Sequence, residues 1–559
     1  MTMTTPDSSL QLPATSTNGH ARREALYGGP LAFPDGNYVT YRSAGRLLVI
    51  GPEERALPAA RRLRDILDVY ALLTVPGQDA LSWPDIDDFG ARLRRGAPPS
   101  VSGHLGAFTA RVWDGGRDAD LPQVLGAGEV FDLVLDLGAT PALRRQKNPP
   151  GYYAVGPDGD LDGALAELSD LIGDFDKPRY FAYEPDLCVH GNRGQRGCTR
   201  CLDQCATEAI RSAGERIEVD PFLCQGCGTC ATVCPTGAIT YAWPSPEHLI
   251  DHVRGILRRY RSAGGSDPVL LFHDAEGDAE LVAGWAPDLP ESVLPVGVED
   301  TGSVGPDTWL AALAYGAGRV VLVMGAETPA SERAATQTEL ATTQALIEAL
   351  GYPQDRLALV DPAGDAMPLA DAPPPLVDAP AGFAAFGGKR AVMRLALDHL
   401  WQAAGAPAVT SALPEGAPFG RIAVDGDACT LCMACVSVCP VQALEGGGDQ
   451  PRLSFREDRC VQCGMCERAC PEDAITLEPR IDPANLQAAD GRVVHEEPLH
   501  HCPECGKAFA TRKLIERMEQ RLADHWMFAG EDARRRLRLC EDCRVQAVLR
   551  DEGSIDPYR

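Results

Sequence analysis

The sequence has no apolar run long enough to cross a bilayer. Hydrophobic residues make up 45% of its 559 residues, but no stretch approaches the ~18 uninterrupted apolar residues that a membrane-spanning helix needs. Arg22 and Arg23 are not followed by an apolar segment, so neither a secretory nor a twin-arginine signal is predicted. We therefore expect a cytoplasmic protein without a transmembrane segment, and a disordered polar tail over residues 1–40.

The chain also lacks the basic excess that nucleic-acid binding requires. It has 79 acidic and 52 basic residues, and its formal net charge is −27. Because a phosphate backbone attracts a basic surface, this balance excludes a general nucleic-acid binder. The acidic charge favours protein partners with a basic docking face, although it is equally typical of a surface selected for solubility alone.

Cysteine is absent from the long segment between Cys234 and Cys429, although the chain contains 20 cysteines. All of them fall in short clusters before and after this gap. Disulfides are rare in a reducing cytoplasm, and scattered structural thiols would not be grouped in this way. The grouping therefore indicates metal ligation.

The motif C-x2-C-x2-C-x3-C-P occurs three times, and an Ala-Ile or Ala-Leu pair follows each copy. The copies are CQGCGTCATVCPTGAI (224–239), CTLCMACVSVCPVQAL (429–444) and CVQCGMCERACPEDAI (460–475). Three closely spaced cysteines fold a tight loop around one 4Fe-4S cluster, and the fourth cysteine opens a short helix. Zinc would not need the third cysteine, so we predict iron–sulfur clusters.

Paired motifs of this kind exchange ligands, because the fourth cysteine of each motif binds the cluster of the other motif. In the second module the two predicted ligand sets are therefore Cys429, Cys432, Cys435 and Cys470, and Cys460, Cys463, Cys466 and Cys439.

The stretch CVHGNRGQRGCTRCLDQC (188–205) stands where a fourth motif would be expected. Its last cysteine lies 19 residues before Cys224, and the corresponding step in the second module is 21 residues. The first two cysteines are farther apart than in the other motifs, and Ala206 replaces the proline. The predicted ligand sets of this first module are Cys188, Cys198, Cys201 and Cys234, and Cys224, Cys227, Cys230 and Cys205. The alternative is that Cys188 is free and its site holds three irons or none.

The longer loop of this divergent motif carries positive charge. It contains His190, Arg193 and Arg196, and Arg200 follows closely. Positive charge and N–H donors near a cluster favour its reduced form and raise its potential. We expect the loop to tune the potential or to dock an acidic partner, with a plain solvated loop as the alternative.

The last four cysteines have a different spacing. Cys502, Cys505, Cys540 and Cys543 form the pattern C-x2-C-x34-C-x2-C, which is typical of a structural zinc site in a ribbon-like fold. A single iron bound as in rubredoxin is the alternative. His500 and His501 adjoin the first pair, but four cysteines already complete a tetrahedron, so we expect no ligand role for either histidine.

The remaining sequence predicts α/β domains. Apolar strand signals at 45–51, 70–75 and 131–138 alternate with a helix at 58–68 that places Leu63, Ile66 and Leu67 on one face. No G-x-G-x-x-G follows the first strand, so a dinucleotide site is not expected there. Strands and helices also alternate over residues 268–362, which favours a parallel sheet covered on both faces.

A helix is marked after the first cysteine-rich segment. Ser245 is its expected N-cap, Pro246 lies in its first turn and Gly264 stops it. Its predicted apolar face consists of Leu249, Ile250, Val253, Ile256, Leu257 and Tyr260.

The predicted fold class is multidomain α/β, with two dicluster ferredoxin modules of the α+β type and a zinc-ribbon-like end. The predicted divisions are a tail (1–40), an α/β domain (41–178), module one (179–243), a linking helix (244–266), an α/β domain (267–364), a linker and helix (365–415), module two (416–482) and a zinc-ribbon-like helical domain (483–559).

Two resemblances extend this interpretation. The segments PPGYYAVGP (149–157), GDFDKPRYFAYEPDLCVHGNRGQRGCTRCLDQC and CQGCGTCATVCPTGAITYAWP resemble bacterial 4Fe-4S polyferredoxin-like proteins encoded with membrane-bound formate dehydrogenases. Residues 268–362, including GAGRVVLVMG, resemble the delta subunit of methyl-viologen-reducing hydrogenases. That subunit has cysteines for a further cluster, so this resemblance implies a domain that kept the fold and lost the cofactor.

We therefore expect a non-catalytic electron-transfer subunit of an oxidoreductase, with four 4Fe-4S clusters and one zinc ion. The resemblance implies redox partners in a formate dehydrogenase system. One alternative is a maturation or scaffold protein whose clusters are structural or redox-sensing. A complete oxidoreductase with a nucleotide at the turn GAETPAS (325–331) is the least favoured, because no glycine fingerprint accompanies the turn.

Overall fold

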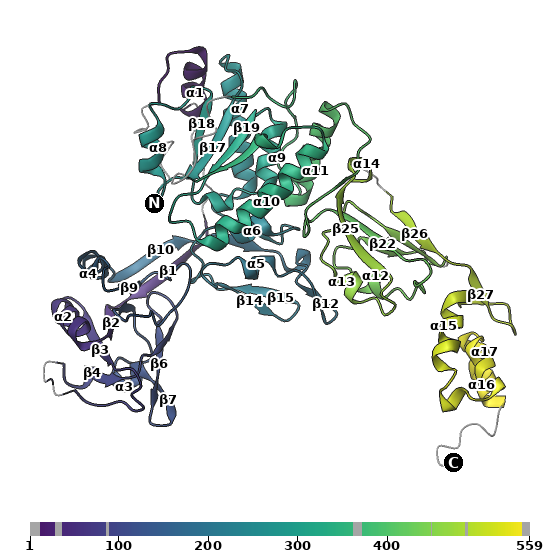
Figure 1. The fold of residues 1–559 in the computed structure, drawn as a ribbon, viewed down its shortest axis with the longest axis horizontal. Coiled ribbons are helices and arrows are strands. Elements are labelled where there is room, and N and C mark those ends of the chain that lie inside the picture. The colour runs from purple at the N-terminus through teal and green to yellow at the C-terminus, as the bar shows by residue number, and fades with distance from the viewer. Residues whose placement is uncertain are drawn as a thin grey trace.

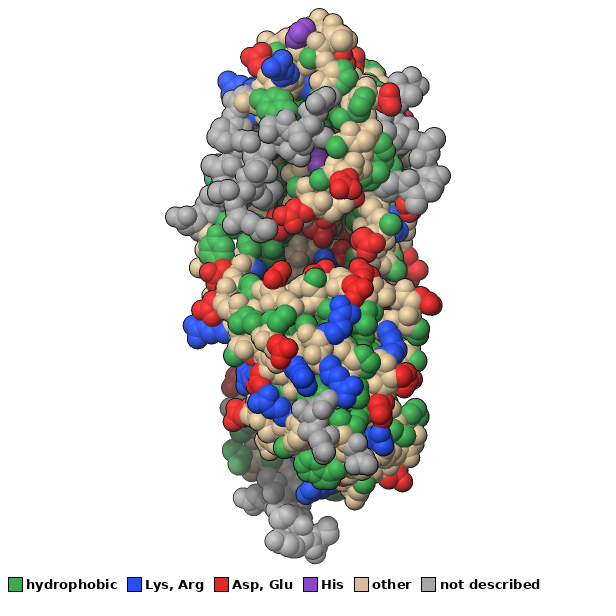
Figure 2. Space-filling view, turned by 90° about the vertical axis from the view of Figure 1, so that its left-hand side faces the viewer, with side chains coloured by type: hydrophobic (Ala, Val, Ile, Leu, Met, Phe, Trp, Pro, Cys, Tyr) green, Lys and Arg blue, Asp and Glu red, His purple; other side chains and the backbone are tan. Residues whose placement is uncertain are grey.

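The computed structural model describes residues 12–27, 36–84, 86, 89–361, 372–448, 450–486 and 490–550. Figure 1 shows an N-terminal α/β domain, a middle α/β domain, two cysteine-rich modules and a C-terminal domain at the far end of the molecule. Two separate parallel sheets confirm the predicted α/β class. Figure 2 shows one face of the molecule, where acidic side chains gather around a hollow.

The N-terminal domain is built on a five-stranded parallel sheet with the order β4-β3-β2-β8-β9. Helices α2 and α4 pack on one face, and an antiparallel sheet β5-β6-β7 packs on the other. The strands predicted at 45–51, 70–75 and 131–138 are confirmed as β2, β3 and β8. The elements are β2 (Arg46–Gly51), α2 (Glu53–Leu63), β3 (Asp68–Thr74), β4 (Leu93–Gly96), β5 (Ser100–Ser102), β6 (Thr109–Asp114), β7 (Arg117–Asp120), α3 (Leu121–Leu125), β8 (Leu133–Asp136), β9 (Tyr152–Ala154) and α4 (Leu161–Ser169).

Helix α2 begins and ends earlier than the sequence predicts. It spans Glu53–Leu63 and includes Pro58, whereas a helix over 58–68 was expected. Leu63 and Leu67 are buried as predicted, but the side chain of Ile66 is 54% exposed because it follows the end of the helix.

The middle domain contains a four-stranded parallel sheet with the order β18-β17-β19-β20. Helices cover one face with a large apolar core, and α8 contributes to a smaller core on the other face. The predicted parallel sheet with two covered faces is therefore confirmed. The elements are β17 (Val269–Asp274), α8 (Ala279–Trp285), β18 (Val293–Val298), η3 (Thr301–Ser303), α9 (Pro306–Ala314), β19 (Arg319–Val323), α10 (Ala330–Ala349) and β20 (Leu357–Val360).

Two helices predicted as connections belong to the core of the middle domain. Helix α7 (Pro246–Ser262) has the predicted N-cap, because the Ser245 side chain accepts a hydrogen bond from the His248 N–H. Its six predicted apolar side chains are all buried, and they share one core with α9 and α11 (Gly388–Ala403). Neither helix is a free linker. Of the predicted linker, residues 362–371 lie outside the described residues.

The prediction of a disordered tail is wrong for residues 17–27, which form helix α1 (Thr17–Tyr27). Ala21, Ala25 and Leu26 are buried in the core of the middle domain. Arg22 is only 1% exposed and donates hydrogen bonds to the carbonyl oxygens of Pro290 (3.1 Å) and Val293 (3.4 Å). The sequence did not identify this helix, because its core partners lie more than 200 residues away in the chain. Residues 1–11 and 28–35 lie outside the described residues.

Each cysteine-rich module combines short helices with antiparallel strands, as the α+β prediction requires. In module one, strands β1 and β10 connect to the N-terminal domain, and β11 pairs with β16. The elements around module one are β1 (Tyr38–Ser43), β10 (Gly173–Pro178), β11 (Phe181–Tyr183), η2 (Pro185–Leu187), β12 (Gly191–Asn192), β13 (Gln195–Arg196), α5 (Arg200–Asp203), β14 (Ile210–Ala213), β15 (Arg216–Val219), α6 (Thr229–Val233) and β16 (Ile239–Tyr241).

Module two extends beyond its predicted limit at residue 482, because strand β26 completes the sheet β23-β24-β26. Its elements are β21 (Ser411–Ala412), β22 (Gly420–Val424), α12 (Ala434–Val438), β23 (Leu444–Gly446), β24 (Arg452–Phe455), α13 (Met465–Arg468), β25 (Ile475–Ile481), α14 (Pro483–Leu486) and β26 (Arg492–Glu496). The C-terminal domain consists of β27 (Leu499–His501), β28 (Ala508–Thr511), α15 (Arg512–Leu522), α16 (Glu531–Leu537) and α17 (Glu541–Arg550). In the part of the chain that the structure describes, no helix combines the length and apolarity that a bilayer crossing requires.

The position of α1 yields a stability prediction. Arg22→Ala leaves buried carbonyl oxygens without their donor, so we expect the free energy of unfolding of the middle domain to fall by about 1–3 kcal/mol. Arg23→Ala is the matched control, because Arg23 is exposed on the same helix. Denaturant unfolding of both variants measures the difference. Equal stabilities would contradict the role assigned to Arg22.

Candidate metal centres

The structure brings the eight cysteines of module one together in two sets of four. Cys188, Cys198, Cys201 and Cys234 line one cavity. Cys205, Cys224, Cys227 and Cys230 line a second cavity. Each set contains the fourth cysteine of the other motif, which is the exchange that the sequence predicts. All the cysteines of the chain are free of disulfides.

The divergent motif of module one forms the same terminal turn as the motifs of module two. In each, an amide N–H four residues after the fourth cysteine donates to its sulfur, and the residue before that amide has a positive φ. The donors are Ala209 to Cys205 (3.2 Å), Ala443 to Cys439 (3.2 Å) and Ala474 to Cys470 (3.3 Å). The positive φ values are 53° at Glu208, 51° at Gln442 and 49° at Asp473. Ala206 therefore maintains this turn without the proline.

The inserted loop of the divergent motif folds into a small hairpin of β12 and β13. His190 is 1% exposed, and its Nδ1 and Nε2 bond to the Cys198 carbonyl (2.8 Å) and the Ser212 hydroxyl (2.7 Å). The histidine thus fixes the loop against Cys198. Arg193 and Arg196 are exposed, which leaves both potential tuning and partner docking as predictions.

Positive charge beside the first cavity comes from Arg200, which follows the loop and begins α5. Burial raises the pKa of the Cys198 thiol to about 11, and the nearby positive charge of Arg200 opposes this shift. Arg200 also pairs with Glu339 of the middle domain (3.2 Å).

The cysteines of module two show the same exchange. Cys470 is an electrostatic neighbour of Cys429 and Cys435, and Cys439 is a neighbour of Cys463 and Cys466. Cys432 is exposed, whereas Cys460 is buried. In each predicted set, three cysteines of one motif thus lie near the fourth cysteine of the other motif. The sets are Cys429, Cys432, Cys435 and Cys470, and Cys460, Cys463, Cys466 and Cys439.

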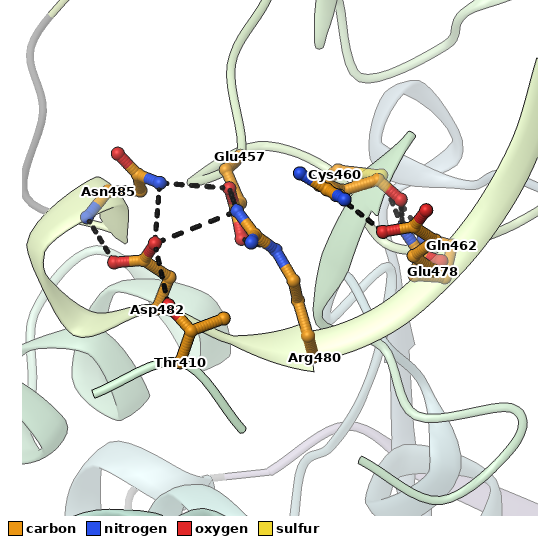
Figure 3. Close-up of polar contacts among 9 residues, drawn as sticks. Thr410, Glu457, Cys460, Gln462, Glu478, Arg480, Asp482 and Asn485 are labelled. Atoms are coloured by element: carbon orange, nitrogen blue, oxygen red, sulfur yellow. Dashed lines mark hydrogen bonds and ion pairs between the residues drawn. The ribbon is translucent and has the colours of Figure 1, made fainter. Parts of the chain in front are cut away.

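Figure 3 shows the polar contacts that position Cys460. Its sulfur accepts hydrogen bonds from the Gln462 side chain (3.3 Å) and the Gln462 amide (3.5 Å). On the strand behind, Arg480 pairs with Glu457 (2.8 Å) and Asp482 (3.6 Å), and so fixes β25 to the segment before Cys460. Hydrogen bonds to a ligand sulfur favour the reduced cluster, so Gln462 is a tuning residue if this site is filled.

Burial raises the pKa of several thiols of these sites when no metal is bound. It raises the pKa of Cys435 to about 12 and that of Cys460 to about 11, and it raises the pKa of Cys227 and Cys230 well above the usual thiol range. Because iron binds thiolates, cluster binding must release protons. The positive charge of the iron must also stabilise the thiolates, because burial removes the water that would otherwise solvate them.

The sequence missed several residues that the other domains bring to the second cavity. Asp300 and Glu332 of the middle domain are electrostatic neighbours of Cys227, and burial raises the pKa of both carboxyl groups. Lys177 donates a hydrogen bond to the Phe222 carbonyl (3.3 Å) near Cys224, and burial lowers its pKa to about 8. None belongs to the cysteine motifs, so no local sequence signal identifies them.

The turn GAETPAS lies at the carboxyl end of β19 and opens α10. The Ser331 N–H donates to the Gln146 side chain of the N-terminal domain (3.0 Å), and Arg333 donates to the Gly325 carbonyl (2.8 Å). The Ser331 N–H and the Gly325 carbonyl are thus paired within the protein. The nucleotide alternative stays untested.

The C-terminal domain assembles the four predicted zinc ligands. The sulfur atoms of Cys502, Cys505, Cys540 and Cys543 all lie within 4.8 Å of one another. Four thiols this close together suit zinc and also a single iron. His500 bonds instead to the Arg538 carbonyl (3.1 Å). The domain docks on module two through Thr511 and Thr430 (3.2 Å).

Comparisons with known proteins identify the cysteine-rich segments. A 4Fe-4S dicluster domain matches residues 428–474, and a 4Fe-4S binding domain matches residues 217–240. A 7Fe ferredoxin of Hydrogenibacillus schlegelii is 45% identical over 54 residues, which cover 10% of this chain and 69% of that ferredoxin. An uncharacterized ferredoxin of Methanocaldococcus jannaschii is 40% identical over 43 residues, or 8% of this chain and 69% of the relative. Indolepyruvate oxidoreductase subunit IorA of Methanothermobacter marburgensis is 43% identical over 42 residues, or 8% of this chain, and the match spans only 7% of that subunit.

A glycine of module one tests the contact between the second cavity and the middle domain. Gly228 has a φ of +74°, and a Cβ there would lie 2.4 Å from the Ser303 Cβ. We expect Gly228→Ala to cost about 1–2 kcal/mol of backbone strain and about 1–3 kcal/mol from the clash, so that iron–sulfur absorbance is lost faster in denaturant.

The matched control is Gly464→Ala in module two. Gly464 holds the same motif position with a φ of +76°, but a Cβ there would approach only the flexible end of Arg468 closely, at 2.8 Å. We expect this variant to show the backbone strain and a displaced Arg468 guanidinium, but no clash with another domain. Equal rates of absorbance loss in the two variants would contradict the close contact with Ser303.

Proposed function

Because the chain belongs to the 4Fe-4S ferredoxin family, we propose that it is an electron-transfer protein carrying four 4Fe-4S clusters, two in each module. The observation that carries this proposal is the grouping of sixteen cysteines into four sets of four, each completed by a cysteine from the neighbouring motif. Each set supplies the four thiolates that one cluster requires.

The proposed clusters have no free coordination position for a substrate. Each of the four irons of a cluster would take one cysteine, so no iron is open to a substrate. The chemistry of the sites is then one-electron transfer. This supports a non-catalytic subunit of an oxidoreductase. A cluster supplies the electron when it is bound, while the chain's own residues shield it and, through donors such as Gln462, bias its potential.

We propose that the partners are redox proteins, with a formate dehydrogenase system as the specific candidate. Support for this candidate comes only from the resemblance of the segments around 149–244 to proteins encoded with such enzymes. The net charge of −27 favours a partner with a basic face and argues against nucleic acid. We propose a cytoplasmic location, because thiolate metal sites of this kind suit a reducing compartment.

We propose a structural zinc ion at the C-terminal site. Zinc is redox-inert, so the domain would serve folding or docking and would lie outside the electron path. The middle domain is proposed to be a relative of the hydrogenase delta subunit that lacks its cysteines; between Cys234 and Cys429 the sequence contains none. Its carboxyl edge instead contacts module one, where Thr232 donates to the Gly302 carbonyl (2.7 Å).

Removing one cluster ligand distinguishes electron transfer from a scaffold role. Cys463→Ser is expected to abolish electron transfer from a one-electron donor to an acceptor dye, while assembly with formate dehydrogenase subunits is retained. Cys505→Ser is the control, because its site lies outside the proposed path and its loss should leave the transfer rate unchanged. Transfer that survives in Cys463→Ser while assembly fails would support the scaffold role instead.

A further inference from the structure

The two cysteine-rich modules meet in a small apolar cluster that we call the junction. It consists of Val189 from module one and Val438, Val461 and Met465 from module two, whose exposed fractions are 3%, 6%, 4% and 0%. Cys198 packs against the junction from module one, and Cys463 packs against it from module two. The junction therefore borders one predicted ligand set of each module.

Hydrogen bonds fix the two modules at the junction. The Asn192 side chain donates to the Val438 carbonyl (3.1 Å). The Arg468 guanidinium donates to the carbonyl oxygens of Arg196 and Cys463. These contacts join the hairpin of β12 and β13 to the helices of module two, and Figure 1 shows β12 beside α12 and α13.

A side chain at Gly197, the residue after β13, would meet atoms of both modules. A Cβ at Gly197 would lie 2.5 Å from the Met465 Cε and 2.2 Å from the Val189 carbonyl oxygen. Gly197 belongs to the long loop that separates Cys188 from Cys198. The insertion that makes the first motif divergent is therefore the segment that builds the contact between the modules.

We infer that electrons pass between the modules through this junction. The inference rests on the proposed function. The two clusters involved would be those of Cys188, Cys198, Cys201 and Cys234, and of Cys439, Cys460, Cys463 and Cys466. One reduced cluster loses one electron and the other gains it, with no bond broken and no proton moved. One-electron donor and acceptor proteins supply and remove that electron.

The packing of the junction suits such a step. A close-packed, dry contact keeps the two clusters near each other and excludes the water that would reorganise when charge moves. Within each module the two ligand sets are also neighbours, since Cys201 and Cys230 lie in one apolar cluster and Cys435 and Cys466 lie in another.

The four clusters then form one linear series whose two middle members face each other at the junction. The outer member in module one includes Cys227, which borders the middle domain. The outer member in module two includes Cys432, which is exposed. The exposed end is the end that a partner can approach.

Magnetic interaction between reduced clusters tests the inference on the full-length chain. Cys227→Ser with Cys432→Ser leaves the two junction clusters, and Cys198→Ser with Cys463→Ser leaves the two outer clusters. After iron analysis shows about eight iron per chain in both, each is reduced and examined by electron paramagnetic resonance. We expect signals split or broadened by spin–spin interaction in the first chain and two separate signals in the second.

Two isolated signals from the junction pair, at full iron content, would overturn the inference. That outcome would leave the proposed function standing, because the clusters would be present. Iron missing from the unaltered chain would instead count against the proposed function itself.

A second variant tests the junction without removing a cluster ligand. Val438→Asp places a negative charge in the junction, so it should lower the midpoint potential of the module-one cluster that disappears in Cys198→Ser. Val436→Asp is the control, because Val436 lies on the same helix but packs in the core of module two. A Val438→Asp chain in which only module-two potentials shift would overturn the inference.

Discussion

The exchange of one cysteine between paired motifs is the constraint on which the cysteine-rich half of this protein depends. Cys234 completes the set of the first motif, and Cys205 completes the set of the second. Neither motif can therefore hold a full complement of ligands alone, and each module must fold around two clusters at once. The same turn, with an amide N–H bonded to the fourth sulfur, recurs at Cys205, Cys439 and Cys470. Burial of the thiols adds to this dependence, because thiolates in these cavities need the charge of bound iron.

The other domains enclose module one and leave module two more open. The middle domain places the edge of its parallel sheet, where folds of this class commonly bind ligands, against the helix that follows Cys227. The close approach of Ser303 to Gly228 leaves no room for a side chain. The C-terminal domain contacts module two at Thr430, beside the exposed Cys432. This arrangement gives the chain one enclosed end and one end that a protein partner can reach.

The sequence predicted the parts of the structure that depend on local spacing. The strands of both parallel sheets and the apolar face of α7 follow from patterns within a few residues, and the cysteine sets follow from the spacing of the repeated motif. Ile66 was placed on the helix by mistake, because α2 ends at Leu63. The apolar periodicity alone does not show where a helix ends. Helix α1 was missed because its apolar residues pack on α7, more than 200 residues away. Asp300 and Glu332 are brought beside Cys227 only by the tertiary fold. The contacts of the inserted loop with Val438 and Met465 also depend on the tertiary fold, so local sequence patterns do not predict them.

We propose that the divergent motif binds a cluster like the other three motifs. The most direct measurement is the content of iron, acid-labile sulfide and zinc in anaerobically purified protein. We expect about 16 iron, about 16 sulfide and about one zinc per chain, with a complete cluster at Cys188, Cys198, Cys201 and Cys234. About 12 iron per chain would contradict it, because module one would then hold a single cluster and the electron path would be interrupted beside the junction.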